Sequence, residues 1–123
     1  MTINVIAVKP SFEDERGIIT NILDEKIYGA VLITCNKGAI RANHYHQRDS
    51  HWSYMLSGKM EYYEKPSDGD LEMEIVKAGQ MVFSATNVPH AMKFLEPSVF
   101  LALTTSKRLD GRYDKDIIRV KLI

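Results

Sequence analysis

No stretch of this chain keeps a helical repeat of apolar residues, whereas short stretches of alternating polar and apolar residues recur along its whole length. Successive side chains of a β-strand point to opposite faces, so such alternation is typical of half-buried strands. Turn signals such as PSDG at 66–69 separate these stretches about every 8–12 residues, which favours a sandwich or barrel. We expect strands over 4–9, 18–23, 28–35, 40–46, 51–57, 59–64, 71–76, 81–84, 90–95, 99–105 and 117–123.

Four parts of the chain carry more specific expectations. The run YGAVLITC at 28–35 is apolar and β-branched, which is typical of a strand covered on both faces. Residues 11–17, SFEDERG, form a polar, turn-prone segment, and 107–115 have the character of a loop. Cys35 is the one cysteine, so it cannot form an internal disulfide, and we expect a small buried hydrophobic side chain there.

Length and charge exclude several classes of protein. The 123 residues are the size of one domain, and we expect a single domain over 1–123. Sixteen basic residues balance sixteen acidic ones, so the basic surplus of a nucleic-acid-binding protein is lacking. No apolar run approaches the ~20 residues of a membrane-spanning helix, and the first ten residues lack a signal-peptide pattern. We therefore expect a cytoplasmic protein without nucleic-acid or membrane partners.

All four histidines of the chain fall in two places. His44 and His46 are two residues apart, so on a strand their side chains share one face. A turn-prone tetrapeptide at 47–50 follows, and His51 begins the next strand. Two neighbouring strands thus deliver three imidazoles across a short hairpin, and His90 follows from a segment further along. A single inward histidine is commonly a satisfied core residue, but four of them need a common explanation.

The spacing of Gly38, His44, His46, His51 and Gly58 resembles the first conserved motif of the cupin superfamily, with His51 where glutamate is usual. A second cupin motif resembles the segment that runs from Gly79 to His90. There Ala85 replaces the usual proline, Asn87 the usual glycine and Phe94 a frequent asparagine. Asparagine tolerates a positive φ better than most residues, so Asn87 is a reasonable replacement.

This resemblance implies an all-β fold, a single-domain cupin jelly-roll β-barrel, in which four positions converge as metal ligands. The implied ligands are His44, His46, His51 and His90. The chemistry agrees, because burying several unpartnered imidazoles costs about 1–3 kcal/mol each, whereas one divalent ion accepts all their lone pairs. Imidazole is a suitable ligand for Zn, Fe, Ni, Cu and also Mn, and the four histidines do not identify which of these metals is bound. A neutral ligand set keeps the full charge of the metal and favours enolate-like or anionic groups.

A second resemblance is to the nucleotide-sugar branch of the cupins, which includes dTDP-4-dehydrorhamnose 3,5-epimerases and sugar 3,4-ketoisomerases. It rests on three short segments: FEDERG at 12–17, RANHYH at 41–46 and YDKDIIRV at 113–120, of which the last resembles cupin domains of polysaccharide-biosynthesis proteins. Ala42 stands where that branch has glycine. The resemblance implies an isomerase or epimerase of surface-polysaccharide biosynthesis, acting on a nucleotide-linked keto sugar.

Such a reaction removes a proton next to a carbonyl, stabilises an enediolate and returns a proton. The resemblance makes His44 the candidate base, a tyrosine the candidate acid, and Arg16 and Arg41 the candidate ligands of the diphosphate. Four tyrosines are available as the acid, of which we choose Tyr54 or Tyr62; the other two are Tyr45 and Tyr63. The two roles of His44 conflict, because a lone pair given to a metal cannot also accept a proton. If His44 binds metal, a tyrosine, Lys59 or Glu61 would have to move the proton.

Two other functions remain open at this point. Small cupins with several ligand histidines also include metal-dependent dioxygenases, for which oxygen uptake with iron, copper or manganese is diagnostic. A sugar-binding cupin without catalysis is the other alternative. Cupins of this size commonly pair through outer strands, so the resemblance also implies a homodimer, for which the strand at 4–9 is a plausible edge.

Overall fold

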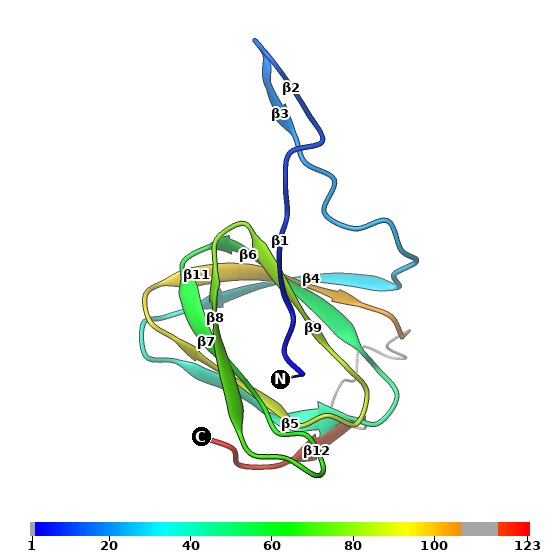
Figure 1. The fold of residues 1–123 in the computed structure, drawn as a ribbon, viewed down its shortest axis with the longest axis vertical. Coiled ribbons are helices and arrows are strands. Elements are labelled where there is room, and N and C mark those ends of the chain that lie inside the picture. Colours follow the sequence, from blue (N-terminus) through cyan, green and yellow to red (C-terminus); the bar gives the residue numbers. More distant parts are fainter. Residues whose placement is uncertain (1, 107–115) are drawn as a thin grey trace.

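The computed structural model describes residues 2–106 and 116–123, and they form two five-stranded antiparallel sheets and a separate hairpin. The first sheet has the order β1-β9-β6-β11-β4 and the second β12-β5-β10-β7-β8. The two sheets face one another around a common interior, and the β2–β3 hairpin projects away from them (Figure 1). The strands are β1 (Val5–Ala7), β2 (Phe12–Asp14), β3 (Gly17–Ile19), β4 (Gly29–Cys35), β5 (Ile40–His46), β6 (His51–Ser57), β7 (Lys59–Glu64), β8 (Glu72–Lys77), β9 (Gln80–Ser84), β10 (His90–Phe94), β11 (Ser98–Thr104) and β12 (Ile117–Arg119). This all-β jelly-roll architecture confirms the expected fold class.

The core lies between the two sheets and follows from the alternation of each strand. In β7 every second residue is buried, so Met60, Tyr62 and Glu64 face the interior. Met55 of β6 and Phe94 of β10 are also fully buried, and Phe94 stacks on Phe100 with ring centroids 5.7 Å apart. Each large apolar side chain removed from water in this way stabilises the fold by about 1.5–3 kcal/mol. The register of the sheets is therefore set by which face is apolar.

Strand β5 contains a bulge directly before the first histidine. Ala91 of β10 pairs with Ala42, whereas His90 pairs with His44, so Asn43 is the extra residue. Ala42 and Asn43 both have positive φ, 68° and 53°. The amide oxygen of Asn43 accepts the backbone N–H groups of residues 122 and 123, at 2.9 and 3.2 Å. The bulge thus secures the C-terminal segment beside the strand that carries the histidines.

Two sequence expectations about the fold are wrong. Strand β4 is not covered on both faces: it is an edge strand, and Leu32 is 63% exposed. Two of its three exposed positions, Ala30 and Leu32, are apolar, so the run lacked the polar alternation of a half-buried strand. Residues 11–17 are not only a turn, because β2 and β3 pair from Phe12↔Ile19 to Asp14↔Gly17. The loop expected at 107–115 lies outside the described residues.

Other local expectations are confirmed. Asn87 has φ 65°, as its place in the second motif predicted. The turn at 66–69 is closed by a hydrogen bond from the backbone N–H of Gly69 to the carbonyl oxygen of Pro66, with the two atoms 3.1 Å apart. Cys35 is buried. In the part of the chain that the structure covers, no helix has the length and hydropathy needed to cross a membrane.

Candidate functional site

The rings of all four histidines meet in the interior of the fold. His44 and His46 come from β5, His51 from β6 in the opposite sheet, and His90 from the start of β10. The ring of His44 lies 4.8 Å from that of His46 and 4.9 Å from that of His90, measured between centroids. The ring of His51 lies 5.2 Å from His46 and 5.5 Å from His90. The expected convergence of distant parts of the chain is therefore what the fold produces.

Three of these four imidazoles form a group that fits a metal ion. His44, His46 and His90 each offer a ring nitrogen, and these three nitrogens lie within 4.8 Å of one another. His51 does not belong to this group, although its ring is adjacent. Its role as a fourth ligand stays a prediction.

The backbone and one carboxylate orient two of the three rings. Nδ1 of His46 lies 3.2 Å from Oδ2 of Asp116, and Nδ1 of His90 lies 3.1 Å from the carbonyl oxygen of Val88. Both partners only accept hydrogen bonds, so Nδ1 carries the proton in each neutral ring and Nε2 keeps its lone pair. Nε2 of His90 is buried and has no hydrogen-bond partner among the described residues. A buried orphan acceptor of this kind is what a metal ligand provides.

His44 differs from the other histidines in exposure and in its partner. It is only half-buried, whereas His46, His51 and His90 are 5%, 6% and 1% exposed. Desolvation, followed by the charges of His90 and His46, lowers the pKa of His44 to about 3. Burial likewise lowers the pKa of His90 to about 4. Both rings are therefore neutral near pH 7, the form that binds a metal or accepts a proton.

Arg119 of β12 approaches His44, with Nη1 3.5 Å from Nδ1. A guanidinium can only donate, so in this arrangement the neutral ring of His44 carries its proton on Nε2. A metal at Nε2 would require that proton to move to Nδ1 and Arg119 to withdraw. Sequence reasoning did not single out Arg119, because its position beside His44 depends on the pairing of β12 with β5.

Asp116 also joins the site without having been singled out. Its carboxylate accepts the backbone N–H groups of Arg48 and Asp49, at 2.8 and 3.0 Å, in addition to facing His46. Desolvation raises the pKa of Asp116, but these two backbone hydrogen bonds and His46 together outweigh it and lower the pKa below its usual value. The carboxylate therefore stays ionised and holds the turn before His51 in place.

A buried hydroxyl network adjoins the cluster on the side of His90. The ring of Tyr62 stacks near His90, with centroids 6.2 Å apart, and its hydroxyl lies 2.9 Å from Oε1 of Glu64 and 2.7 Å from Oγ of Ser84. Burial, and then the charge of Glu64, raises the pKa of Tyr62 well above 10. Burial also raises the pKa of Glu64, which is 4% exposed. Glu64 was missed, although a glutamate on the same strand face as Met60 and Tyr62 was a visible signal.

Three other residues expected at the site are not brought to the cluster. Tyr54 alternates with His51, Ser53 and Met55, whose side chains are buried, so it lies on the outer face of β6. Arg16 is on the projecting hairpin, ion-paired with Asp14 at 2.6 Å. Arg41 donates from Nε to Sγ of Cys35 at 3.1 Å and from Nη2 to the carbonyl oxygen of Thr34 at 3.0 Å. Tyr54 is placed by strand alternation, Arg16 by its pairing with Asp14 two residues away, and Arg41 by its contacts with β4.

Comparison with known proteins agrees with this geometry. The cupin domain family matches residues 31–104, which contain all four histidines. Among curated proteins, oxalate decarboxylase OxdC of Bacillus subtilis (strain 168) is 30% identical over 86 residues, 68% of this chain. The chain spans only about a fifth of the length of that relative, 22%.

Several solved structures share the fold. A 3,4-ketoisomerase from Helicobacter canadensis has a TM-score of 0.79 at 17% identity, with 97% of this chain and 91% of that chain covered. A mutant of the 3,4-ketoisomerase QdtA from Thermoanaerobacterium thermosaccharolyticum, in complex with TDP-4-keto-6-deoxyglucose, has a TM-score of 0.76 at 21% identity, covering 95% and 86%. The dTDP-4-dehydrorhamnose 3,5-epimerase of Sulfolobus tokodaii has a TM-score of 0.71 at 16% identity, covering 90% and 74%. The expected likeness to the nucleotide-sugar branch is thus confirmed for the fold.

Proposed function

This chain belongs to the cupin domain family, and on that premise we propose that it is an isomerase or epimerase of nucleotide-linked 4-keto sugars. The proposed reaction is proton removal beside the ketone, followed by return of a proton to a neighbouring carbon of the enediolate. The substrate class comes from the structural neighbours, one of which holds TDP-4-keto-6-deoxyglucose. The proposed context is surface-polysaccharide biosynthesis.

One observation carries the proposal: a neutral, half-exposed imidazole and a buried tyrosine hydroxyl flank the same buried ring. His44 lies on one side of His90, at 4.9 Å, and Tyr62 on another, at 6.2 Å. His44 is the member of the cluster that a substrate reaches most readily, so we assign it as the base. Its pKa of about 3 without substrate makes it a weak base, so the negative charge of the bound substrate has to raise its basicity. Because its pKa is raised, Tyr62 keeps its own proton, and in the reaction its O–H turns from Oε1 of Glu64 to donate a hydrogen bond to the oxygen that gains charge in the enediolate.

We assign to Arg119 the anion-binding role that the sequence suggested for Arg16 and Arg41. It is the arginine of the described residues that contacts a histidine of the cluster. A guanidinium binds phosphate or enediolate oxygens in a fork geometry. Its movement from Nδ1 of His44 onto the substrate anion leaves a lone pair on His44, so substrate binding and activation of the base are linked.

We also propose an alternative form of the site that contains a divalent metal. His44, His46 and His90 would hold it, with His51 as the predicted fourth ligand, and imidazole suits Zn, Fe, Mn, Ni and Cu. When bound, the ion supplies Lewis-acid stabilisation of the carbonyl oxygen. In that form His44 is a ligand and not the base. Metal analysis of the purified protein, with His90→Gln as the comparison, tests the assignment.

We also propose a cytoplasmic homodimer. Strand β1, inside the segment expected to pair, is an edge strand of its sheet. The projecting hairpin adds exposed apolar side chains, with Phe12, Ile18 and Ile19 at 51%, 57% and 63% exposure. Unpaired strand edges and exposed apolar surface favour association. Sedimentation equilibrium checks the oligomeric state. The proposed cytoplasmic location is supported by the proposed substrate class.

The decisive experiment follows carbon-bound hydrogen in D₂O. The protein is incubated with TDP-4-keto-6-deoxyglucose, and NMR follows deuterium entry beside the carbonyl and the position of the ketone. His44→Asn should lower the exchange rate by about 10²-fold or more, whereas Tyr54→Phe, on the outer face, should not change it. Binding of this sugar nucleotide without deuterium entry would overturn the proposal and support a binding protein without catalysis.

A metal-dependent dioxygenase is the alternative favoured by a specific observation. The orphan Nε2 of His90 and the three clustered ring nitrogens fit a metal centre, and the curated relative is an oxalate decarboxylase. Oxygen uptake by the iron-, copper- or manganese-loaded protein with an enediol or diketone supports this reading. Zinc-loaded protein that isomerises the sugar without oxygen uptake opposes it.

A further inference from the structure

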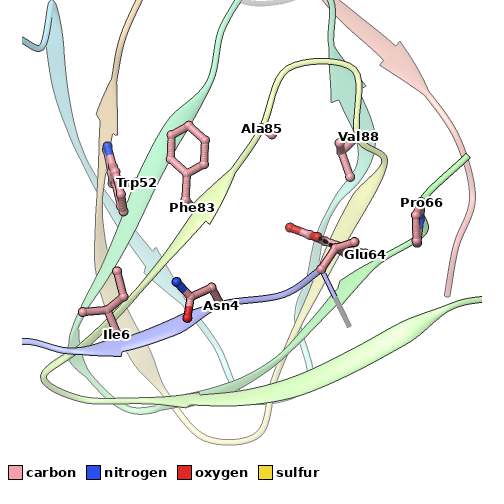
Figure 2. Close-up of a pocket in the computed structure, with 9 residues that line it drawn as sticks. Asn4, Ile6, Trp52, Glu64, Pro66, Phe83, Ala85 and Val88 are labelled. Atoms are coloured by element: carbon pink, nitrogen blue, oxygen red, sulfur yellow. Dashed lines mark hydrogen bonds between the residues drawn. The ribbon is translucent and has the colours of Figure 1, made fainter.

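A cavity of about 300 Å³ lies where the N-terminal strand crosses the fold. Its walls come from the N-terminal segment, β6, β9 and the end of β7. Figure 2 shows Trp52 and Phe83 on one side of the cavity and the carboxylate of Glu64 directed toward them from the other. Asn4 and Thr2 complete its polar lining. Of these residues, Glu64 belongs to the buried hydroxyl network described above, and Thr2 contacts that network through Glu64.

The aromatic wall is well defined. Trp52 and Phe83 are paired across β6 and β9, and their ring centroids are 4.6 Å apart with the planes inclined by 49°. Both side chains lie on the outer face of the sheet, opposite to His51 and Ser84. Two inclined rings offer π faces from different directions, which suits a rounded cationic group.

The opposite end of the cavity is acidic. Glu64 and Glu72 are direct cross-strand partners in β7 and β8, an arrangement of like charges that destabilises a sheet. They share the hydroxyl of Thr2, which lies 3.0 Å from Oε2 of Glu64 and 3.3 Å from Oε1 of Glu72. Among the described residues, no lysine or arginine side chain pairs with either carboxylate. A cationic ligand would relieve this repulsion.

Charge and size together select the class of ligand. The described lining contains one acidic side chain and no basic one, so a diphosphate or another anion is disfavoured. The volume is larger than a bare metal ion needs, and carboxylates facing an aromatic pair lack the convergent oxygen set of a Mg²⁺ or Ca²⁺ site. An organic cation matches both the acidic end and the aromatic wall.

We propose that this cavity binds a small organic ammonium group, held between the Trp52–Phe83 pair and the carboxylate of Glu64. The cation lies over the aromatic faces, and the negative charge of Glu64 balances its positive charge. The inference does not depend on the isomerase proposal, because it concerns a different ligand class, although Glu64 also contacts Tyr62 of the proposed catalytic site.

The chain contains a single tryptophan, so its fluorescence reports directly on this cavity. Choline is titrated at constant ionic strength, and 3,3-dimethylbutan-1-ol, its neutral isostere, is the matched ligand. Choline should change the fluorescence saturably, and the alcohol should bind at least about tenfold more weakly. Calorimetry on the same samples gives an independent dissociation constant.

Matched variants locate the ligand. Glu64→Gln should weaken choline binding about tenfold or more, and Glu72→Gln should weaken it less. Glu61→Gln removes a carboxylate from the outer face of the same strand and should leave binding unchanged. Circular dichroism checks that each variant is folded, and Phe83→Leu provides a second test if Glu64→Gln does not fold. Equal affinity for choline and its neutral isostere, unchanged choline binding in folded Glu64→Gln or in Phe83→Leu, or no saturable binding at all would overturn the proposal.

Discussion

Oδ2 of Asp116 lies 3.2 Å from Nδ1 of His46, and this contact joins two residues that are 70 positions apart in the chain. The carboxylate accepts a hydrogen bond from the ring N–H at Nδ1. The lone pair of His46 is therefore on Nε2, which faces the cluster. The same side chain accepts the N–H groups of Arg48 and Asp49. One carboxylate thus orients a candidate ligand and holds the turn that leads to His51.

Replacing Asp116 by asparagine should weaken metal binding. An asparagine amide keeps an oxygen that can accept hydrogen bonds from the turn, but it lacks the negative charge that makes His46 more basic. Loss of a group that is hydrogen-bonded to a metal-ligating histidine typically lowers metal affinity about 10–100-fold. Cobalt(II) titration followed by visible absorption measures the change. Asp70→Asn, at an exposed position, is the control. Unchanged cobalt affinity in Asp116→Asn would show that this carboxylate does not support a metal ligand.

Tyr62→Phe should impair both catalysis and stability. The lost hydrogen bond to the charged enediolate oxygen should lower kcat by about 10²-fold. Oγ of Ser84 and Oε1 of Glu64 also lose their buried partner, which should lower the free energy of unfolding by about 1–3 kcal/mol. Kinetics of the sugar reaction and urea unfolding measure the two effects. Tyr54→Phe should change neither, so equal kcat in the two variants would remove Tyr62 from the mechanism.

Glu64→Gln should change how stability depends on pH. Burial raises the pKa of Glu64 in the folded protein above its unfolded value near ~4.5, so the folded state retains a proton that the unfolded state releases. The contribution of Glu64 to the free energy of unfolding is therefore fully present at low pH, and it is lost as the pH rises through the pKa of Glu64 in the folded protein. The melting temperature of Glu64→Gln relative to the natural protein should increase between pH 4 and pH 8, a range chosen to begin below ~4.5. Glu61→Gln controls for loss of a carboxylate, and a melting-temperature difference independent of pH would contradict the prediction.

Ala42→Gly should stabilise the fold. Ala42 has φ 68°, and a left-handed conformation costs a residue with a Cβ about 1–2 kcal/mol. Glycine adopts it freely but has a larger entropy loss on folding of about 0.5–1 kcal/mol, so the net gain should be below about 1 kcal/mol. Urea unfolding measures it. Ala30→Gly, in an extended part of β4, should instead destabilise, and destabilisation by both variants would show that the bulge is not strained at Ala42.

Local patterns account for most of the strands. Alternation predicts β5, β6 and β7 with the observed bounds, 40–46, 51–57 and 59–64, because a period of two is a property of the strand itself. It fails at β4, where the exposed face is also apolar, and at β2, where a polar hairpin resembles a turn. In both places burial depends on what packs against the strand.

The candidate site likewise has some features that are local in the sequence and others that depend on how distant strands pair. The two-residue spacing of His44 and His46 is a local feature that places both side chains on one face. That His90 meets them was expected from the resemblance to the cupin motifs. The positions of Asp116 and Arg119 are not local, because they follow from the pairing of β12 with β5. The choice between Tyr54 and Tyr62 likewise required knowing which face of each strand is interior.

The amino-acid order alone therefore specifies an all-β chain that concentrates its imidazoles at two points, because strand periodicity and turn chemistry act over a few residues. Only the packed fold decides that Arg16 and Arg41 lie away from those imidazoles, that Arg119 and Asp116 contact them, and that Glu64 faces both Tyr62 and a separate cavity. These contacts join residues distant in the chain. Their energies depend on a register and a burial that exist only after the two sheets have closed on one another.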